Sequence, residues 1–361
     1  MTDNIDDLLD QADNKAIEGK YADAIEDLNK VIALDPDNLE AYISRGAAKN
    51  ELEQYNEAIA DLDTAIALDP DDSEAYVSRS TAKNELGQHD EAIADLDTAI
   101  ALDPDDPMPY YYRGLIRGEK GQHAAAVADF DIALSLEPLV VESYVARGTS
   151  KGRLGQYFEA LTDFDSALRH FPDFAIAYAG RGFVKANLGY PSDAISDFDI
   201  AIDLNPELAD VYVSRGNAKT ELEEYEDAIA DYDTAIRLRS DDFTVYIQRA
   251  FANIGLDQGE EAVADCEAAI RVDPNHYMAY KVRADAKVRL QKCADAIADY
   301  DKSIELEPEF IDAYISRALS KCVIHRRGSA KRDFQRALKL ANEHDNQELA
   351  EQIEWMMNDL L

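Results

Sequence analysis

A proline recurs every 34 residues along most of this chain. Eight of the eleven prolines share one phase: Pro36, Pro70, Pro104, Pro138, Pro172 and Pro206, then Pro274 and Pro308 after one missed step. The interval divides the chain, without insertion or deletion, into ten units that start at Asp7, Ala41, Ala75, Pro109, Ser143, Ala177, Val211, Val245, Ala279 and Ala313. A fixed period of this length indicates a repeat array, in which each unit packs on its neighbours.

Each unit predicts two helices. In the unit from Ala41 to Glu74, the residues Ala58, Leu62 and Ala65 have helical spacing, and Pro70 stops this second helix, called helix B. The first half of the unit predicts helix A, with a short connection between the two. One such hairpin cannot bury its own apolar stripe, so the units must stack. The sequence therefore predicts an all-α solenoid.

Small residues stand at two fixed places in the units. Helix A has Gly46, Gly114, Gly148, Gly182 and Gly216, with Ala or Ser in the other complete units, and helix B has alanine in all ten, from Ala24 to Ala330. A tyrosine stands early in helix A in nine units, from Tyr42 to Tyr314. With this period and these residues, nearly the whole chain resembles the tetratricopeptide repeat family. The resemblance implies a right-handed superhelix of ten helix-turn-helix units within residues 1–346.

The last segment, residues 347–361, carries apolar residues at helical spacing and the only tryptophan, Trp355. We expect it to be a C-terminal capping helix that covers the last hairpin. A docking helix for a partner is the alternative.

Arginine and aspartate form two further columns. Arginine follows the tyrosine by three residues in nine units, from Arg45 to Arg317, and aspartate stands on helix B in all ten, from Asp27 to Asp333. The family often has leucine at the arginine place, and the Y-x-x-R-G version resembles bacterial arrays. Because both columns border the apolar faces, we interpret them as a ladder of ion pairs between packed helices. A row of ligand-binding arginines is the alternative, and the spacing leaves open which aspartate each arginine meets.

The resemblance also implies a concave groove, lined by helix-A positions around and after the tyrosine. The candidate partner-binding residues at these positions are Glu40, Asn50, Glu51, Glu74, Asn84, Glu85, Tyr111, Tyr112, Glu119, Phe183, Asn217 and Phe251. Carboxylates and amides can hold an extended peptide, and aromatic residues can anchor it. Alternatively, the aromatic residues pack on neighbouring helices. At the positions of the family's carboxylate clamp only Lys281 and Asn217 match, in different units, so we expect no clamp.

Charge limits the class of partner. The chain has 74 acidic and 36 basic residues, a net charge of −38. Such a charge repels nucleic-acid phosphates and anionic membranes, so we expect a basic or neutral protein segment as partner. The charge is also uneven, because residues 1–108 carry −22 whereas residues 313–346 carry +5.

No motif predicts chemistry. The cysteines Cys266, Cys293 and Cys322 lack disulfide or zinc spacing, and no phosphate-binding loop, nucleophile elbow or metalloprotease motif occurs. We therefore expect no cofactor, no metal and no enzyme activity. The acidic start lacks the features of a secretory signal, and the longest stretch without charge, Gly121 to Ala128, is too short to span a membrane. The expected location is cytoplasmic.

The expected function is a non-catalytic scaffold or adaptor that binds an extended, basic or neutral segment of another protein in the groove. Two alternatives stay open. The chain could be a structural element that self-assembles through its acidic N-terminal and basic C-terminal ends. It could also be the regulatory subunit of an enzyme complex, which differs from the first interpretation only in the partner's identity.

Overall fold

The computed structural model describes residues 5–138, 141–239 and 242–360. These residues form 21 α-helices and no strand, as the sequence predicts. The helices A are α1 (Ile5–Ile17), α3 (Leu39–Glu51), α5 (Ser73–Glu85), α7 (Pro107–Glu119), α9 (Val141–Arg153), α11 (Ala175–Asn187), α13 (Ala209–Glu221), α15 (Phe243–Gly255), α17 (Tyr277–Arg289) and α19 (Ile311–Val323). The helices B are α2 (Tyr21–Leu34), α4 (Tyr55–Leu68), α6 (His89–Leu102), α8 (His123–Leu136), α10 (Tyr157–His170), α12 (Pro191–Leu204), α14 (Tyr225–Leu238), α16 (Gly259–Val272), α18 (Cys293–Leu306) and α20 (Arg327–Glu343), and α21 (Gln347–Leu360) follows them.

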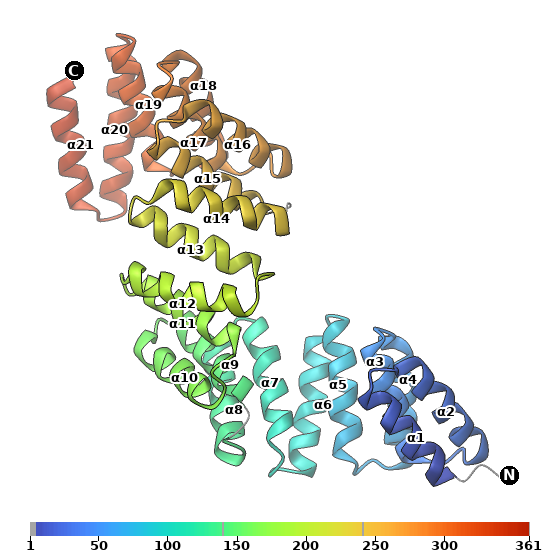
Figure 1. The fold of residues 1–361 in the computed structure, drawn as a ribbon. Coiled ribbons are helices and arrows are strands. Elements are labelled where there is room, and N and C mark those ends of the chain that lie inside the picture. The colour runs from blue at the N-terminus through green and yellow to red at the C-terminus, as the bar shows by residue number, and fades with distance from the viewer. Residues whose placement is uncertain (1–4, 139–140, 240–241, 361) are drawn as a thin grey trace. The chain divides into compact units, whose positions relative to one another are not determined.

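The chain divides into two compact parts, residues 1–180 and 181–361, with the boundary inside α11. Within each part, successive helices A and B pack as antiparallel pairs in chain order (Figure 1). Helices A also contact the next helix A, as α3 does with α5 and α7 with α9, whereas no two helices B in the described ranges make a comparable contact. This pattern places the helices A on the side where neighbouring repeats approach most closely, which is the inner side of a curved stack.

The boundaries of the helices follow from local chemistry. Asn38 and Asp72 cap helices A, since their side-chain oxygens accept hydrogen bonds from the backbone N–H of Ala41 and Ala75. At the other end of the hairpin, helix B stops two residues before the periodic proline, as at Leu68 and Pro70. Helix A begins two residues before each predicted unit start, because the cap lies upstream of the tyrosine.

The turn between helix A and helix B places one residue in the left-handed region. Glycine occupies this position in five repeats, as Gly87 does with φ 73°. Other residues occupy it in the rest, as Glu53 does with φ 59°. A left-handed residue after a helix lets the next N–H groups bond to the last free carbonyl groups of the helix. Here the N–H of Gln54 bonds to the carbonyl oxygen of Lys49.

The glycines on helix A are contact points for a large side chain of helix B. A Cβ atom at Gly46 would lie 2.7 Å from Cγ of Leu62, and one at Gly114 would lie 2.6 Å from Cε1 of Phe130. Both distances are shorter than real Cβ contacts, so a larger residue at Gly46 or Gly114 would require the side chain opposite to move. The predicted small-residue contacts are therefore confirmed.

The arginine and aspartate columns form the predicted ladder. The carboxylate of Asp163, only 2% exposed, accepts hydrogen bonds from Nε and Nη2 of Arg147 at 3.0 and 2.6 Å. Lys151, one turn further along helix A, donates to the same carboxylate at 2.8 Å. All nine arginines bind the aspartate of their own repeat, 16 residues further on, in this way.

Most of these arginines also reach the preceding repeat. Nη1 of Arg147 donates to Asp131, on the preceding helix B, at 2.6 Å. Arg79, Arg113, Arg215, Arg249 and Arg317 make the same contact with the aspartate 16 residues before them. The guanidinium group also lies over the tyrosine three residues before it, with Cζ of Arg147 5.6 Å from the ring centre of Tyr144. The arginine column is thus engaged within the array and binds two successive repeats together.

The C-terminal helix α21 packs on α20. Its residue Ile353 is fully buried in a cluster with Phe334 and Leu340, while Trp355 is 67% exposed. This helix covers apolar surface that the last hairpin would otherwise leave to water. The division of the chain into ten units and a cap stays a prediction.

Candidate functional site

The predicted groove residues of the first repeats form an acidic surface on the helices A. Glu40 and Glu51 on α3, and Glu74 and Glu85 on α5, are all at the surface. None of the four has an ion-pair partner among the described residues. The partnered aspartates of the ladder lie on the helices B instead. These four glutamates therefore add uncompensated negative charge to the inner side, while other exposed carboxylates, such as Glu57 and Glu91, lie on the helices B.

The electrostatics of Glu74 show that three successive helices contribute to this surface. Partial burial of its carboxyl group raises the pKa of Glu74 above the ordinary value. The carboxylates of Asp72, Glu40 and Asp13 raise this pKa further. Asp13 belongs to α1 and Glu40 to α3, so carboxylates from neighbouring helices A lie within electrostatic reach of one another.

Two of the three asparagines of the predicted site, Asn50 and Asn84, bind within the array. Asn50 donates a hydrogen bond from Nδ2 to the backbone oxygen of Ser78 on the next helix A, at 2.9 Å. Oδ1 of Asn84 lies 2.8 Å from Nδ1 of His89 at the start of α6. Both amides thus stabilise packing between helices.

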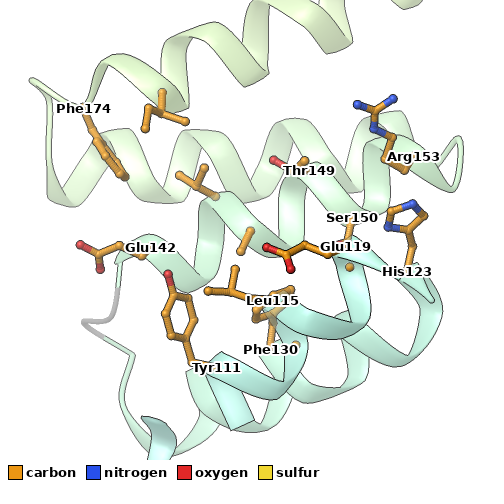
Figure 2. Close-up of a pocket in the computed structure, with 15 residues that line it drawn as sticks. Tyr111, Leu115, Glu119, His123, Phe130, Glu142, Thr149, Ser150, Arg153 and Phe174 are labelled. Carbon is orange, nitrogen blue, oxygen red and sulfur yellow. The ribbon is translucent and has the colours of Figure 1, made fainter. Parts of the chain in front are cut away.

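The next helices A border a hollow of about 480 Å³ (Figure 2). Tyr111, Leu115 and Glu119 of α7 line it, and these are predicted groove positions. The floor is apolar and includes Phe130 of α8. The other walls come from Glu142, Val145, Ala146, Thr149 and Arg153 of α9, and from Phe174 and Ile176 at the start of α11. The volume is in the range of pockets that hold small ligands or single large side chains.

The neighbouring tyrosines Tyr111 and Tyr112 have different surroundings, although the sequence predicts both of them in the groove. The ring of Tyr111 borders the hollow and lies 6.1 Å from the ring of Phe130. Burial, and then the charge of Glu142, raises the pKa of Tyr111. Tyr112 is not part of the hollow and packs on a cluster that contains Leu96 and Ile116. Consecutive residues of a helix point about 100° apart, which explains the difference.

In the second part, Phe183 and Phe251 are 45% and 40% exposed. Neighbouring residues thus cover more than half of each ring, so these rings can be partner anchors or packing residues, and their role in the groove stays a prediction. Asn217 has a partner within the array, because its Oδ1 accepts a hydrogen bond from the hydroxyl of Tyr232 at 2.9 Å. Lys281, in the same part, forms an ion pair with Asp285 at 2.8 Å.

Two family comparisons match segments of the chain. The family described as "TPR repeat" matches residues 82–121 and 216–257, and the family described as "Tetratricopeptide repeat" matches residues 16–76. In each segment the structure has the helical hairpins, the small-residue contacts and the 34-residue step. The chain belongs to the tetratricopeptide repeat family.

Solved structures of other proteins have the same helical repeat fold as this chain. A chain of the APC/C hetero-tetramer Cut9-Hcn1 is 20% identical with a TM-score of 0.61, and the match covers 78% of this chain and 55% of that chain. A tetratricopeptide repeat protein from Parabacteroides merdae is 21% identical with a TM-score of 0.54, and the match covers 69% of this chain and 98% of that chain. This chain thus spans little more than half of the first of these proteins. No curated protein matches the chain significantly.

The α9 side of the hollow is not among the groove residues predicted from the sequence. Glu142, Thr149 and Arg153 stand at the same offsets from Tyr144 as the predicted groove residues do from their own tyrosines, so the same rule would have found them. A second signal is Phe174, which replaces the Asx cap found at Asp72 in the same phase. A large ring at a capping position indicates a local role other than capping.

A metal site, a disulfide bond and a membrane span each have their own structural requirements. Among the described residues, no three His, Cys, Asp or Glu side chains lie close enough together to hold a metal ion. Cys266 and Cys293 are buried, Cys322 is half-buried, and all three are free thiols. None of the described helices combines the length and the hydropathy that crossing a bilayer requires.

Proposed function

We propose that this protein is a non-catalytic scaffold that binds an extended, basic segment of a partner protein on the inner side of its first repeats. Tetratricopeptide repeats are protein-interaction modules, which supports the general role. The observation that carries the sign of the partner is the group of unpaired carboxylates at Glu40, Glu51, Glu74 and Glu85. Like charges held close together on a concave surface focus the field and attract cations.

The inner glutamates also differ from the aspartates of the ladder. The buried aspartates of the ladder, such as Asp61 and Asp95, are each bound by two cationic side chains. Their charge is compensated within the array. The inner carboxylates have no such compensation, so a partner's lysine or arginine side chains can supply it.

The test compares lysine-rich and glutamate-rich peptides by fluorescence anisotropy at low and physiological salt. We expect the lysine-rich peptide to bind and its affinity to fall as salt rises. Changing Glu51 and Glu85 together to Lys should weaken this binding at least about tenfold, because two attractive charges become repulsive. Equal binding of glutamate-rich peptides would contradict the proposal.

A matched control is available on the helices B. Glu57 and Glu91 occupy the same place in two repeats, at the start of the identical segments 57–72 and 91–106, and both are exposed. The double variant Glu57→Lys and Glu91→Lys changes the net charge by the same amount on the other side. It should reduce binding far less than the Glu51→Lys and Glu85→Lys variant if the groove is the site.

Self-assembly is a second candidate function. Exposed cations gather at the start of α20, at Arg326, Arg327, Lys331 and Arg332, and no ion-pair partner is present for them in the described residues. They can meet the acidic first repeats of another copy. Sedimentation at low and high salt tests this, since end-to-end pairing should dissolve on screening.

A cytoplasmic location stays a prediction.

A further inference from the structure

The hollow between α7, α9 and the start of α11 exists because one helix position lacks a side chain. Gly118 occupies the position at which the two preceding repeats have Asn50 and Asn84. A Cβ atom at Gly118 would meet only Oγ of Ser150, at 3.9 Å, so the space beside it is open. This glycine differs from Gly114 on the same helix, where a Cβ atom would strike Phe130.

In the second repeat, an asparagine side chain crosses the corresponding space. In the second repeat, Asn50 donates a hydrogen bond to the backbone oxygen of Ser78 on the next helix A. The residues in the same phase around the hollow are Gly118 and Ala146. The bridging side chain is absent there, and both residues line the hollow. The fourth repeat is therefore open where the second is closed.

The edges of the hollow carry charge. Glu142 lies beside Tyr111 at one end, and its charge raises the pKa of Tyr111 (Figure 2). Glu119 and Arg153 also line the hollow, and their formal charges sum to zero (Figure 2). Glu142 has no ion-pair partner among the described residues. The charged residues of the lining thus sum to a negative charge, which the unpaired Glu142 supplies beside Tyr111.

We propose that this hollow binds an aromatic side chain of the partner segment, and that Glu142 binds a basic residue beside it. The apolar floor and the rings of Tyr111 and Phe174 provide the contacts that aromatic side chains prefer. In an extended segment, the side chains two positions apart lie on the same side, so a lysine two positions from the aromatic residue can reach the edge. This inference rests on the proposed function and specifies which residue anchors the segment.

The probes are four fluorescein-labelled peptides of about ten residues on a glycine-serine frame. The first has a central phenylalanine with a lysine two positions away on each side. The second has serine in place of the phenylalanine, the third has serine in place of both lysines, and the fourth has glutamate in place of both lysines. We expect the first to bind at least about tenfold tighter than the second, because burial of a phenylalanine ring is worth this much or more.

The variant Gly118→Leu fills the hollow. It should reduce the affinity for the first peptide to that for the second and leave the second unchanged. Leucine has a higher helix propensity than glycine, so this variant should melt no lower than the parent protein in circular dichroism. Gly118→Asn, which copies the residue of the two preceding repeats, should act in the same direction. Ala60→Leu, on the exposed side of the helix B α4, is the control and should change neither affinity.

The charge at the edge is tested separately. Glu142→Gln should weaken binding of the first peptide about two- to fivefold, as expected for an ion pair at the surface, and should not affect the third. The fourth peptide should bind more weakly than the third, because its glutamates would lie near Glu142.

The outcomes separate this inference from the proposed function. If phenylalanine adds nothing, or if Gly118→Leu leaves its contribution intact, the inference is wrong. The proposed function still holds in that case if the second peptide binds and loses affinity in the Glu51→Lys and Glu85→Lys variant. If neither lysine peptide binds, the proposed function is wrong. If the third peptide binds in that case and Gly118→Leu abolishes its binding, the hollow is supported as an aromatic site that does not depend on the proposed function.

Discussion

Asp163 illustrates how this acidic chain can bury carboxylates. It is almost inaccessible to water, yet Arg147 and Lys151 both bind it, so the buried group carries no uncompensated charge. A buried ion pair stabilises little compared with apolar residues of the same shape, but removal of one partner is costly. The two members of this pair therefore differ in what their loss leaves behind.

We predict that Asp163→Leu destabilises the array more than Arg147→Leu does. Loss of the aspartate leaves two cationic side chains beside an apolar residue, a change that costs about 3–5 kcal/mol when a buried charge loses its partner. Loss of the arginine leaves Lys151 on Asp163, and leucine is a residue that the family often has there. Urea denaturation of both variants and of the double variant measures the difference.

Asp131 provides the control for this series. It binds the same arginine but is exposed, so Asp131→Leu should cost less than about 1 kcal/mol. An Arg147→Leu protein that unfolds at room temperature would contradict the predicted order.

Glu74 should make stability depend on pH in the opposite sense to a paired carboxylate. Because its pKa is raised in the folded protein, folding disfavours its charged form, and this cost is present at pH values above the raised pKa. Below the ordinary pKa of 4.5 the group is protonated in both states and the cost disappears. Glu74→Gln should therefore raise the melting temperature slightly at pH 7, and this gain should shrink as the pH falls through the raised pKa toward 4.5 and vanish below it.

Thermal melts of the parent and variant at matched pH values check this prediction. Glu57→Gln, on helix B, removes the same charge away from the inner carboxylates and should raise the melting temperature less at pH 7. A larger gain from Glu57→Gln would show that net charge, and not the local cluster, sets the effect.

The hairpin is the element that repeats, and its turn has one strained position. Glycine adopts the left-handed conformation freely, but Glu53 and the corresponding residues of other repeats adopt it at a cost. The array tolerates this cost because each turn is held by the hydrogen bonds of the helix end and by packing on both sides.

Substitutions at this turn should change stability in a predictable direction. Gly121→Ala should lower the free energy of unfolding by about 1 kcal/mol, because alanine does not favour φ near 73°. Glu53→Gly should raise it, by up to about 1 kcal/mol. Ala60→Gly in the exposed middle of α4 is the control and should lower it by about 1 kcal/mol. Equal losses from Glu53→Gly and Ala60→Gly would contradict this account. Denaturant midpoints measure all three.

At the level of the array, each repeat contacts mainly its neighbours, so stability should be nearly additive over repeats. Residues 57–72 and 91–106 are identical, and the helices around them are equivalent. Deletion of residues 75–108 joins Glu74 to Pro109 and keeps the 34-residue register. Proline is tolerated in the first turn of a helix, and Asp72 can accept a hydrogen bond from the N–H of Glu74 in place of that of Ala75, as Asp106 does from Met108 in the parent protein.

We expect this deletion to leave a folded, shorter array. Its helix content per residue in circular dichroism should equal that of the parent protein. Deletion of only residues 75–91 removes half a period and pairs a helix A with the wrong neighbour, so this variant should lose helix content. If both deletions behave alike, the repeat register is wrong.

The helices and their neighbours along the chain follow from the sequence alone. The 34-residue period, the small residues on both helices and the arginine and aspartate columns all reflect contacts between residues at fixed separations. The same residue types recur at the same separations in every repeat, so each repeat must make the same contacts. For this reason the sequence predicts that the arginine column, which includes Arg147, meets the aspartate column, which includes Asp163. The glutamates of the inner side are likewise predicted from their positions in the repeat.

The packing of neighbouring repeats determines which of these positions behave differently from the rest. In the folded array most of the ladder arginines join two repeats, Asn50 closes a space, and Gly118 leaves the same space open. Tyr111 borders the hollow, whereas Tyr112 lies in the packed cluster. These differences arise where side chains of several repeats meet at one point. A periodic pattern does not predict them, because it describes only what the repeats share. A cavity is defined by what is missing between several residues, whereas a sequence pattern records what is present at each.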